Sequence, residues 1–264
     1  MKQLIFQVCL GKAKNSKLYK HCIQSVADYA EKHGIDHIVL ESPKLKIKPD
    51  IFATNRSPES FQKHGGFLPI YEKEVAFEYL DDYDQIAIID ADIYIRPDSP
   101  NIFNDFGREY SFGAVCEREM PTTGAYQNKI INYSRMQYEY LHKHKKIDFK
   151  PNNLGYEFFN MGMILINPVH FKTYLKGQTP KQFIERAEFK DFVDGQGAWK
   201  WSTDQTLLNY FLKKYKVPTQ HLDWKWNGLY TANKHIDKCH FVHFFLKDKL
   251  PNSGENVDEL MEMI

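Results

Sequence analysis

The run Ile86-Ala87-Ile88-Ile89 is the sequence feature that most constrains the fold of this chain. Four apolar residues in a row, without polar alternation, are typical of a strand that is buried on both faces of a sheet. Apolar residues at helical spacing between Tyr71 and Leu80 precede this run. The chain also opens with an apolar strand, Leu4 to Leu10, before a second helical pattern. Strands that alternate with helices predict an α/β fold with a mostly parallel central sheet.

Capping residues and periodicity set the other expected elements. Ser16 is a plausible N-cap and Gly34 a plausible stop for a helix whose apolar face is spaced from 18 to 30. The polar, Pro- and Lys-rich stretch 42–66 is a candidate mobile loop. The remaining patterns predict strands at 37–40, 111–116, 158–166 and 239–244, and helices at 180–192, 203–214 and 257–264.

Length and composition narrow the class of protein. A chain of 264 residues is long enough to bury a sizeable core, and we expect one domain over 1–264, with halves 1–110 and 111–251 and a tail 252–264. With 35 Lys+Arg against 34 Asp+Glu, no overall charge favours a nucleic acid or an anionic membrane as the main partner. The four cysteines form no CxxC pair, which argues for reduced thiols, and no apolar run approaches ~20 residues. These features predict a cytoplasmic protein without a membrane span.

Two carboxylates directly follow the central strand. Asp90 and Asp92 flank Ala91, at the edge where open α/β sheets bind their ligands. In extended backbone, residues i and i+2 point the same way, so both carboxylates can hold one hard cation, which in turn can bridge the two phosphates of a nucleotide sugar. The other interpretation is a charged turn at a strand end. Two like charges beside an apolar strand repel each other unless a cation or a basic group compensates, and a cation is the simpler explanation.

Four separated segments make the chain resemble glycosyltransferase family 8, the family of glycogenin and bacterial lipopolysaccharide galactosyltransferases. They occur in the family's order along the chain: Ile88-Ile89-Asp90-Ala91-Asp92-Ile93, Phe159-Asn160-Met161-Gly162-Met163-Ile164-Leu165-Ile166-Asn167, Thr203-Asp204-Gln205-Thr206-Leu207-Leu208-Asn209, and His243 with Lys249. The chain departs from the family pattern where Leu246 replaces a glycine and Leu250-Pro251 replaces Pro-Trp, and the first strand lacks the usual acidic residue and tyrosine.

The resemblance implies a GT-A fold and a retaining transfer of a hexose from a nucleoside diphosphate sugar, with a UDP-sugar as the best guess. It implies Mn²⁺, or Mg²⁺, as the cofactor, and an imidazole beside two carboxylates suits Mn²⁺ better. The acceptor is a glycan, a lipid-linked saccharide or a protein. The implied roles are metal binding by Asp90, Asp92 and His243; donor binding by Lys73, Asn160, Gly162 and Lys249; and catalysis by Asp204 and Gln205.

Several of these residues also have structural interpretations. A histidine on an apolar strand is often a satisfied core residue, and Lys249 lies among other surface charges. Asp204 and Gln205 open a helix, where Ser202 to Gln205 resembles a capping box. The aromatic residues Trp199, Trp201, Trp224, Trp226 and Tyr230 suit either a core or an acceptor site, and Asn227 resembles a family position near the donor.

Two further carboxylates, Glu117 and Glu119, follow a strand end and could serve an inverting enzyme as general base. Two other functions use the same residues: a nucleotidyltransferase on a related sheet, although no Gly-rich phosphate loop is present, and a non-catalytic carbohydrate-binding protein.

Overall fold

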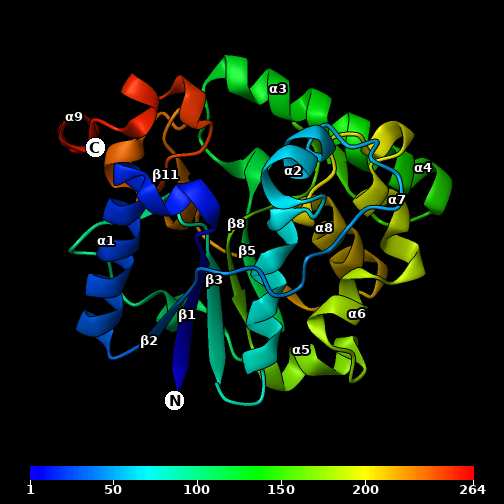
Figure 1. The fold of residues 1–264 in the computed structure, drawn as a ribbon, viewed down its shortest axis with the longest axis horizontal. Helices are drawn as coiled ribbons and strands as arrows, with labels where there is room; N and C mark the ends of the chain where they lie inside the picture. Colours follow the sequence, from blue (N-terminus) through cyan, green and yellow to red (C-terminus); the bar gives the residue numbers. More distant parts are fainter.

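A six-stranded sheet forms the centre of the molecule in a computed structural model that describes residues 1–264 (Figure 1). Its strand order is β2-β1-β3-β8-β5-β9. The six strands are β1 (Gln3–Val8), β2 (Asp36–Leu40), β3 (Gln85–Ile89), β5 (Phe112–Cys116), β8 (Phe159–Ile166) and β9 (Thr219–His221). Strand β8 runs antiparallel to its neighbours β3 and β5, while the other three pairings are parallel. The prediction of a mostly parallel sheet is confirmed.

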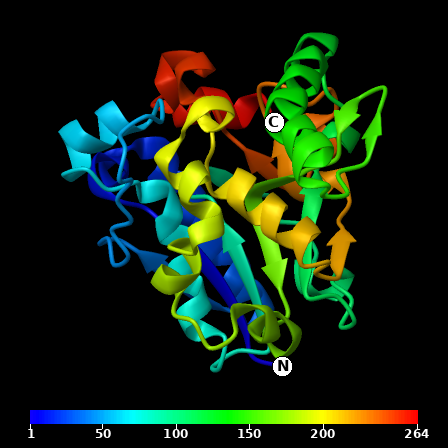
Figure 2. The same cartoon turned by 90° about the vertical axis from the view of Figure 1, so that its right-hand side faces the viewer.

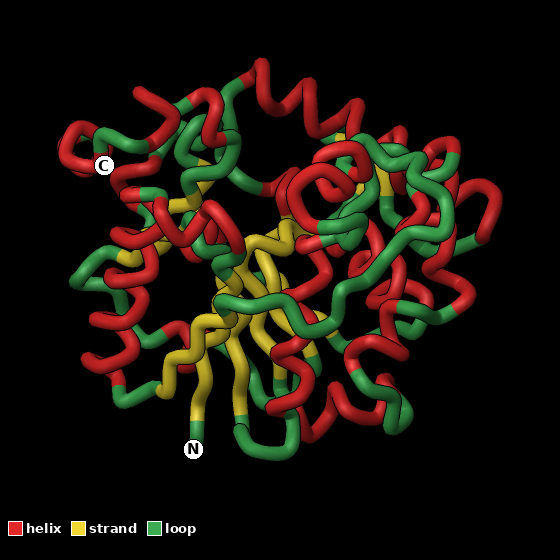
Figure 3. Tube along the Cα trace, in the orientation of Figure 1, coloured by secondary structure: helices red, strands yellow, loops and turns green.

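Helices cover both faces of this sheet (Figure 3). The α-helices are α1 (Lys17–His33), α2 (Ser57–His64), α3 (Gly124–Ser134), α4 (Tyr140–Lys145), α5 (Pro168–Leu175), α6 (Pro180–Ile184), α7 (Lys190–Asp194), α8 (Asp204–Lys214) and α9 (Val257–Glu262). Figure 1 shows α1 on one side of the strands and α5, α6 and α8 on the other. No helix is both long and apolar enough to cross a membrane.

Successive side chains of the central strands enter two different cores. Ile86 and Ile88 belong to the larger core, under the 3₁₀ helix η2 (Pro69–Tyr79) and helices α5, α6 and α8. Ala87 and Ile89 belong to the smaller core, which α1 covers with residues such as Val26. A strand places alternate residues on opposite faces, so an unbroken apolar run is what a sheet covered on both sides requires.

Helix α1 ends as its sequence predicts, because Gly34 adopts a left-handed conformation with φ 65°. Ser16 is the N-cap residue by position, but its side chain makes no capping bond and donates instead to Glu255 Oε1 at 2.7 Å. The prediction of one helix over 180–192 is wrong, since extended backbone at Arg186 separates α6 from α7. The segment 42–66 is also not wholly irregular, because it contains α2.

A second, three-stranded sheet lies beside the carboxyl ends of the central strands. Its strands are β4 (Ile93–Ile95), β10 (Gly228–Leu229) and β11 (Phe241–His243), in the order β10-β11-β4. Strand β11 pairs antiparallel with β4 and sets His243 opposite Ile93. This pairing brings the C-terminal part of the chain back to the acidic pair. In the 90° view of Figure 2, the orange segments of this part lie beside green segments from the middle of the chain.

Candidate functional site

Asp90 and Asp92 lie between β3 and β4, at the carboxyl end of the central strand. The amide of Asp90 donates to Gly162 O at 2.7 Å, which fixes this turn to β8. His243 reaches the pair from β11, with its Nε2 atom 3.3 Å from Asp92 Oδ1 and 3.8 Å from Asp90 Oδ2. Ligating atoms of all three side chains lie within 4.8 Å of one another. The structure therefore brings together the three residues that the sequence predicts as metal ligands.

A chain of hydrogen bonds fixes the orientation of the His243 ring. Its Nδ1 atom lies 3.1 Å from Asn227 Oδ1, and Asn227 in turn donates through Nδ2 to Asn160 Oδ1 at 2.8 Å. An amide oxygen only accepts, so Nδ1 carries a proton, while Nε2 faces Asp90 and Asp92 and is the atom that a metal would take. A metal-ligating histidine is held by its second nitrogen in the same manner. In the sequence, only the resemblance of Asn227 to a family position near the donor pointed to this residue.

The chemistry of these three residues fits a divalent transition metal. Two carboxylate oxygens and an imidazole nitrogen converge as acceptors, and such a set requires a cation or a proton between them. Burial lowers the pKa of His243, but the Asp92 carboxylate outweighs it, and the net shift is upward. Burial also raises the pKa of Asp90, which the charge of Lys73 does not cancel. A metal held by these residues would balance the charge of the carboxylates and would need no proton on the imidazole ring. It would therefore stabilise the charged form of Asp90 and the neutral form of His243.

Gly162 on β8 lies directly against His243. A Cβ atom at this position would meet the imidazole Cε1 atom and lie 2.7 Å from Nδ1. The amide of Gly162 also donates to Asn160 Oδ1 at 2.9 Å. A glycine is needed here because of the close approach of the ring. The pairing of β8 with β5 also shifts register over residues 161–163, so a bulge in β8 contributes as well.

We expect Gly162→Ala to displace the His243 ring. An added methyl group in a packed region costs about 1–3 kcal/mol, and misplacing a ligand by this route should weaken Mn²⁺ binding by roughly 10–100-fold. Isothermal titration with Mn²⁺ measures the change. Gly124→Ala is the matched control, since a Cβ at Gly124 meets nothing within 4 Å. Equal Mn²⁺ affinity in the two variants would contradict the close packing.

Lys73 on η2 connects the acidic pair to helix α8. Its ammonium lies 2.9 Å from Asp90 Oδ1 and 2.7 Å from Asp204 Oδ2, and it donates to Met161 O at 2.9 Å. Burial lowers the pKa of Lys73, but Asp204 and Asp90 outweigh this effect and hold it above its ordinary value. Lys73 is therefore a permanent positive charge between two acidic side chains, Asp90 and Asp204.

Asp204 and Gln205 form the first turn of α8 and face the same cavity. Thr203 caps the helix by accepting from Gln205 N at 3.1 Å, and there is no reciprocal bond of a capping box. Gln205 Oε1 accepts from Met161 N at 3.3 Å. One turn further along α8, Asn209 accepts a hydrogen bond from Phe159 N through Oδ1 and donates one to Phe159 O through Nδ2. These two hydrogen bonds fix α8 to β8. Both Asp204 and Gln205 therefore line the cavity from a helix that is fixed to β8.

A cavity of about 1110 Å³ is lined by all of the predicted site residues except Lys249. Its walls include Lys73, Asp90, Asp92, Asn160, Gly162, Asp204, Gln205 and His243. Lys249 does not line it, and Lys247 does. Leu246 adopts a left-handed conformation with φ 58°, and the following 3₁₀ turn leaves Lys249 exposed. Lys247 instead reaches Ser16 Oγ at 2.9 Å and Glu255 Oε1 at 2.8 Å.

The cavity also holds Tyr126, which the sequence did not single out, beside Glu117, which it did. Tyr126 on α3 donates to Glu117 Oε1 at 2.7 Å, and Asn160 donates to Glu117 Oε2 at 2.8 Å. Burial raises the pKa of Glu117. Glu119, by contrast, does not line the cavity. Tyr126 carries no local sequence signal, whereas Glu117 follows a buried strand directly, as Asp90 does.

The aromatic residues of the second half have different roles. Trp199 and Trp226 are core residues, with 6% and 1% of their surface exposed, and Trp224 packs against the smaller core. Tyr230 packs against a third apolar cluster near α9. Trp201 alone of this group lines the cavity, and 54% of its surface is exposed. An exposed indole at the mouth of a polar cavity is suited to stacking on a ligand.

Comparison with known proteins identifies the family. A sequence model of glycosyl transferase family 8 matches residues 12–249. No curated protein matches the sequence. Among solved structures, similarity extends to a glycosyltransferase involved in glycosylation of the major capsid of PBCV-1, with 13% identity, full coverage of both chains and a TM-score of 0.55.

The galactosyltransferase LgtC, solved with donor and acceptor sugar analogues, has 17% identity over 99% of this chain and 94% of its own, with a TM-score of 0.54. An active-site variant of LgtC matches with a TM-score of 0.53. At this identity the structures establish a shared fold, and the family match establishes the class of enzyme. The chain belongs to glycosyltransferase family 8 and is a glycosyltransferase with the GT-A fold.

Proposed function

We propose that this glycosyltransferase is metal-dependent and transfers a hexose from a UDP-sugar with retention of anomeric configuration. The observation that carries the proposal is the convergence of Asp90, Asp92 and His243 Nε2 at the end of the central strand. Mn²⁺ held there would bridge the diphosphate of the donor and stabilise negative charge on the leaving group.

The chain's own residues would perform the remaining steps. Lys73 holds Asp90 and Asp204 in place. The oxygen of the Asn160 amide already accepts from Asn227 and Gly162 and one N–H donates to Glu117, so the second N–H is the group left for a sugar hydroxyl. Asp204 and Gln205 face the sugar from the start of α8, with Gln205 toward the anomeric carbon. Lys247, or Lys249 after a movement of the 3₁₀ turn, is the candidate cation for the departing diphosphate.

The hydrogen bonds that Glu117 accepts favour retention of anomeric configuration over inversion. An inverting enzyme requires a general base on the face opposite the leaving group. The cavity has two other carboxylates, Glu59 and Glu117. Glu59 is exposed on α2 and paired with Lys63, and both oxygens of Glu117 already accept hydrogen bonds, from Tyr126 and Asn160. Glu117 is therefore suited to hold the site together, and the acceptor hydroxyl would attack on the same face that the diphosphate leaves.

Thermal unfolding with UDP and GDP, with and without Mn²⁺, tests the donor. A ligand at about 100 times its Kd stabilises the folded state by ~2.7 kcal/mol, which corresponds to a rise in Tm of roughly 5–10 °C for a chain of this size. We expect this rise with UDP and Mn²⁺ together, a smaller rise with Mn²⁺ alone and none with UDP alone. A larger rise with GDP would reject the choice of base, and no rise with either nucleotide would reject the donor site.

Product analysis tests the stereochemistry separately. Slow hydrolysis of the donor without an acceptor releases a free sugar, whose anomeric configuration can be read by proton NMR before it equilibrates. We expect the configuration of the donor. Release of the opposite anomer would overturn retention and identify Glu117 as the candidate base.

A further inference from the structure

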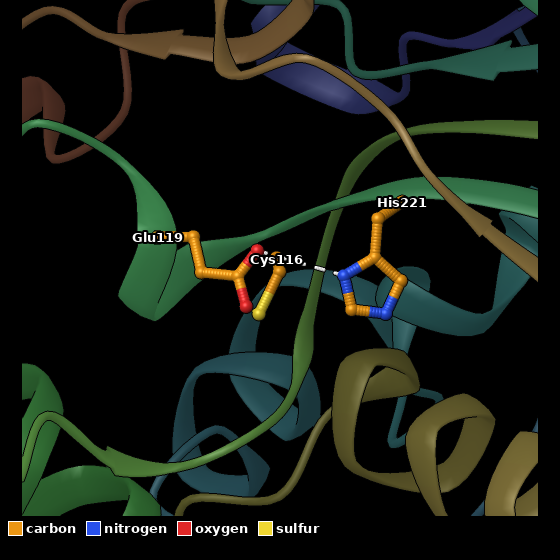
Figure 4. A group of neighbouring side chains, drawn as sticks. All are labelled: Cys116, Glu119 and His221. Carbon is orange, nitrogen blue, oxygen red and sulfur yellow. Dashed lines mark ion pairs between the residues drawn. The ribbon is translucent and has the colours of Figure 1, made fainter. Parts of the chain in front are cut away.

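A second group of metal-ligating side chains lies outside the candidate active site. Cys116 ends β5, Glu119 lies in the 3₁₀ turn η4 (Glu117–Glu119), and His221 ends β9. Their ligating atoms all lie within 4.8 Å of one another. Figure 4 shows the thiol and the carboxylate side by side, with a ring nitrogen of His221 pointing toward them. None of the three lines the cavity of the active site.

The separation of the nitrogen and oxygen ligands suits a tetrahedral ion. His221 Nδ1 lies 3.5 Å from Glu119 Oε2. Zn–N and Zn–O bonds of about 2.0–2.1 Å give a tetrahedron with edges of about 3.3–3.4 Å, close to this separation. On the other side of the ring, Nε2 faces Glu157 Oε1 at 3.9 Å. Glu157 is held by Lys213 and Arg118, so it is placed to orient the ring from outside, as carboxylates do behind metal-bound histidines.

Burial and chemistry favour a soft transition metal. The thiol of Cys116 is buried, whereas the side chains of Glu119 and His221 are 53% and 43% exposed. An ion can therefore enter from solvent and reach the sulfur at the base of the site. A thiolate with an imidazole selects Zn²⁺ over Mg²⁺ or Ca²⁺, in contrast to the two carboxylates of the first site. Three protein ligands leave a fourth position for water.

We propose that Cys116, Glu119 and His221 form a Zn²⁺ site, with water as the fourth ligand. On binding, the sulfur forms a bond to zinc and the thiol proton leaves to solvent, so no oxidation or reduction is involved. The two residues between Cys116 and Glu119 are Glu117, which lines the active-site cavity, and Arg118, which donates to Lys150 O. The ion would fix the turn that carries Glu117, and would join the edge strand β9 to β5.

Cobalt(II) titration tests the site without measuring activity. We expect a near-ultraviolet thiolate-to-cobalt band and visible bands of a tetrahedral ion, both abolished by excess Zn²⁺. Both should persist in Asp92→Asn, which removes the first metal site, and both should be lost in Cys116→Ser and in His221→Ala. The other three cysteines, Cys9, Cys22 and Cys239, are unchanged in these variants and should give no band.

His144→Ala is the matched control, because it also removes an exposed histidine but lies on α4. This variant should retain the wild-type spectrum. Circular dichroism establishes that His221→Ala is folded, so that loss of the band reports the ligand alone. Absence of a thiolate band in the wild type, or its persistence in folded His221→Ala, would overturn the proposal.

Discussion

Asp92→Asn is expected to abolish metal-dependent binding of the donor while leaving the fold intact. The substitution keeps the shape of the side chain but removes the charge that lies 3.3 Å from His243 Nε2. Loss of an outer-shell partner already weakens metal sites by roughly 10–100-fold, so loss of a direct carboxylate ligand should cost at least ~100-fold in Mn²⁺ affinity. Transfer activity at limiting Mn²⁺ should fall by a similar factor. Electron paramagnetic resonance of free Mn²⁺ measures the affinity directly.

Asp98→Asn serves as the control for this experiment. Asp98 is exposed, lies a few residues further along the chain, and does not line the cavity. It removes the same charge from the protein, so a difference between the two variants reports the position and not the net charge. If Asp92→Asn bound Mn²⁺ as tightly as Asp98→Asn, the acidic pair would be a strand-end turn without a metal.

The acidic pair was predictable because its signal is local. A buried apolar strand is recognised from its composition, and open sheets bind their ligands at the carboxyl ends of such strands. The position of Asp90 and Asp92 after β3 is therefore enough to predict them as site residues. Asn160 and Gly162 belong to a strand that is buried along its whole length, and they required the family resemblance. The same rule places Glu117 after β5, and the structure does bring it into the cavity.

The rest of the site depends on long-range contacts that local patterns do not encode. Strands β4, β10 and β11 have only two or three residues each, too few for a periodic signal, yet their pairing positions His243. Tyr126 meets Glu117 only because of the path of the chain into α3. Lys247 lines the cavity in place of the predicted Lys249. The cause is the left-handed backbone at Leu246, a conformation that glycine adopts with less strain than leucine.

The helices also divide into features set by local sequence and features set by tertiary packing. Gly34 stopped α1 as predicted, because a left-handed C-terminal residue is a local requirement. The helical pattern of residues 71–80 falls on the 3₁₀ helix η2 (Pro69–Tyr79) in place of an α-helix, and several of its side chains are buried. Tertiary packing overrides periodicity there, and the same packing carries Lys73 into the site.

Lys73→Met is expected to produce the largest loss of stability among substitutions in the site. Lys73 has only 12% of its side chain exposed, and it contacts Asp90 and the nearly buried Asp204. Methionine keeps the length of the side chain but leaves two carboxylates without their counter-ion. Breaking a buried ion pair from one side costs about 3–5 kcal/mol. For a chain of this size, that corresponds to a fall in Tm of roughly 6–20 °C, measurable by calorimetry.

Lys172→Met is the matched control, since Lys172 pairs with Asp81 at 2.7 Å on the surface, with side chains 43% and 85% exposed. Surface pairs contribute about 0–1 kcal/mol, so this variant should unfold near the wild-type temperature. Equal Tm values for Lys172→Met and Lys73→Met would contradict the central role of Lys73.

A double variant separates the charge of Lys73 from its packing. Adding Asp204→Asn to Lys73→Met removes the carboxylate that the lysine balances and should restore part of the lost stability, with a coupling free energy of about 0.5–3 kcal/mol. Mn²⁺ should also stabilise Lys73→Met more than it stabilises the wild type, because the metal supplies positive charge beside Asp90 that the lysine no longer provides. Additive effects, with no gain from Mn²⁺, would show that Lys73 acts through packing and not through its charge.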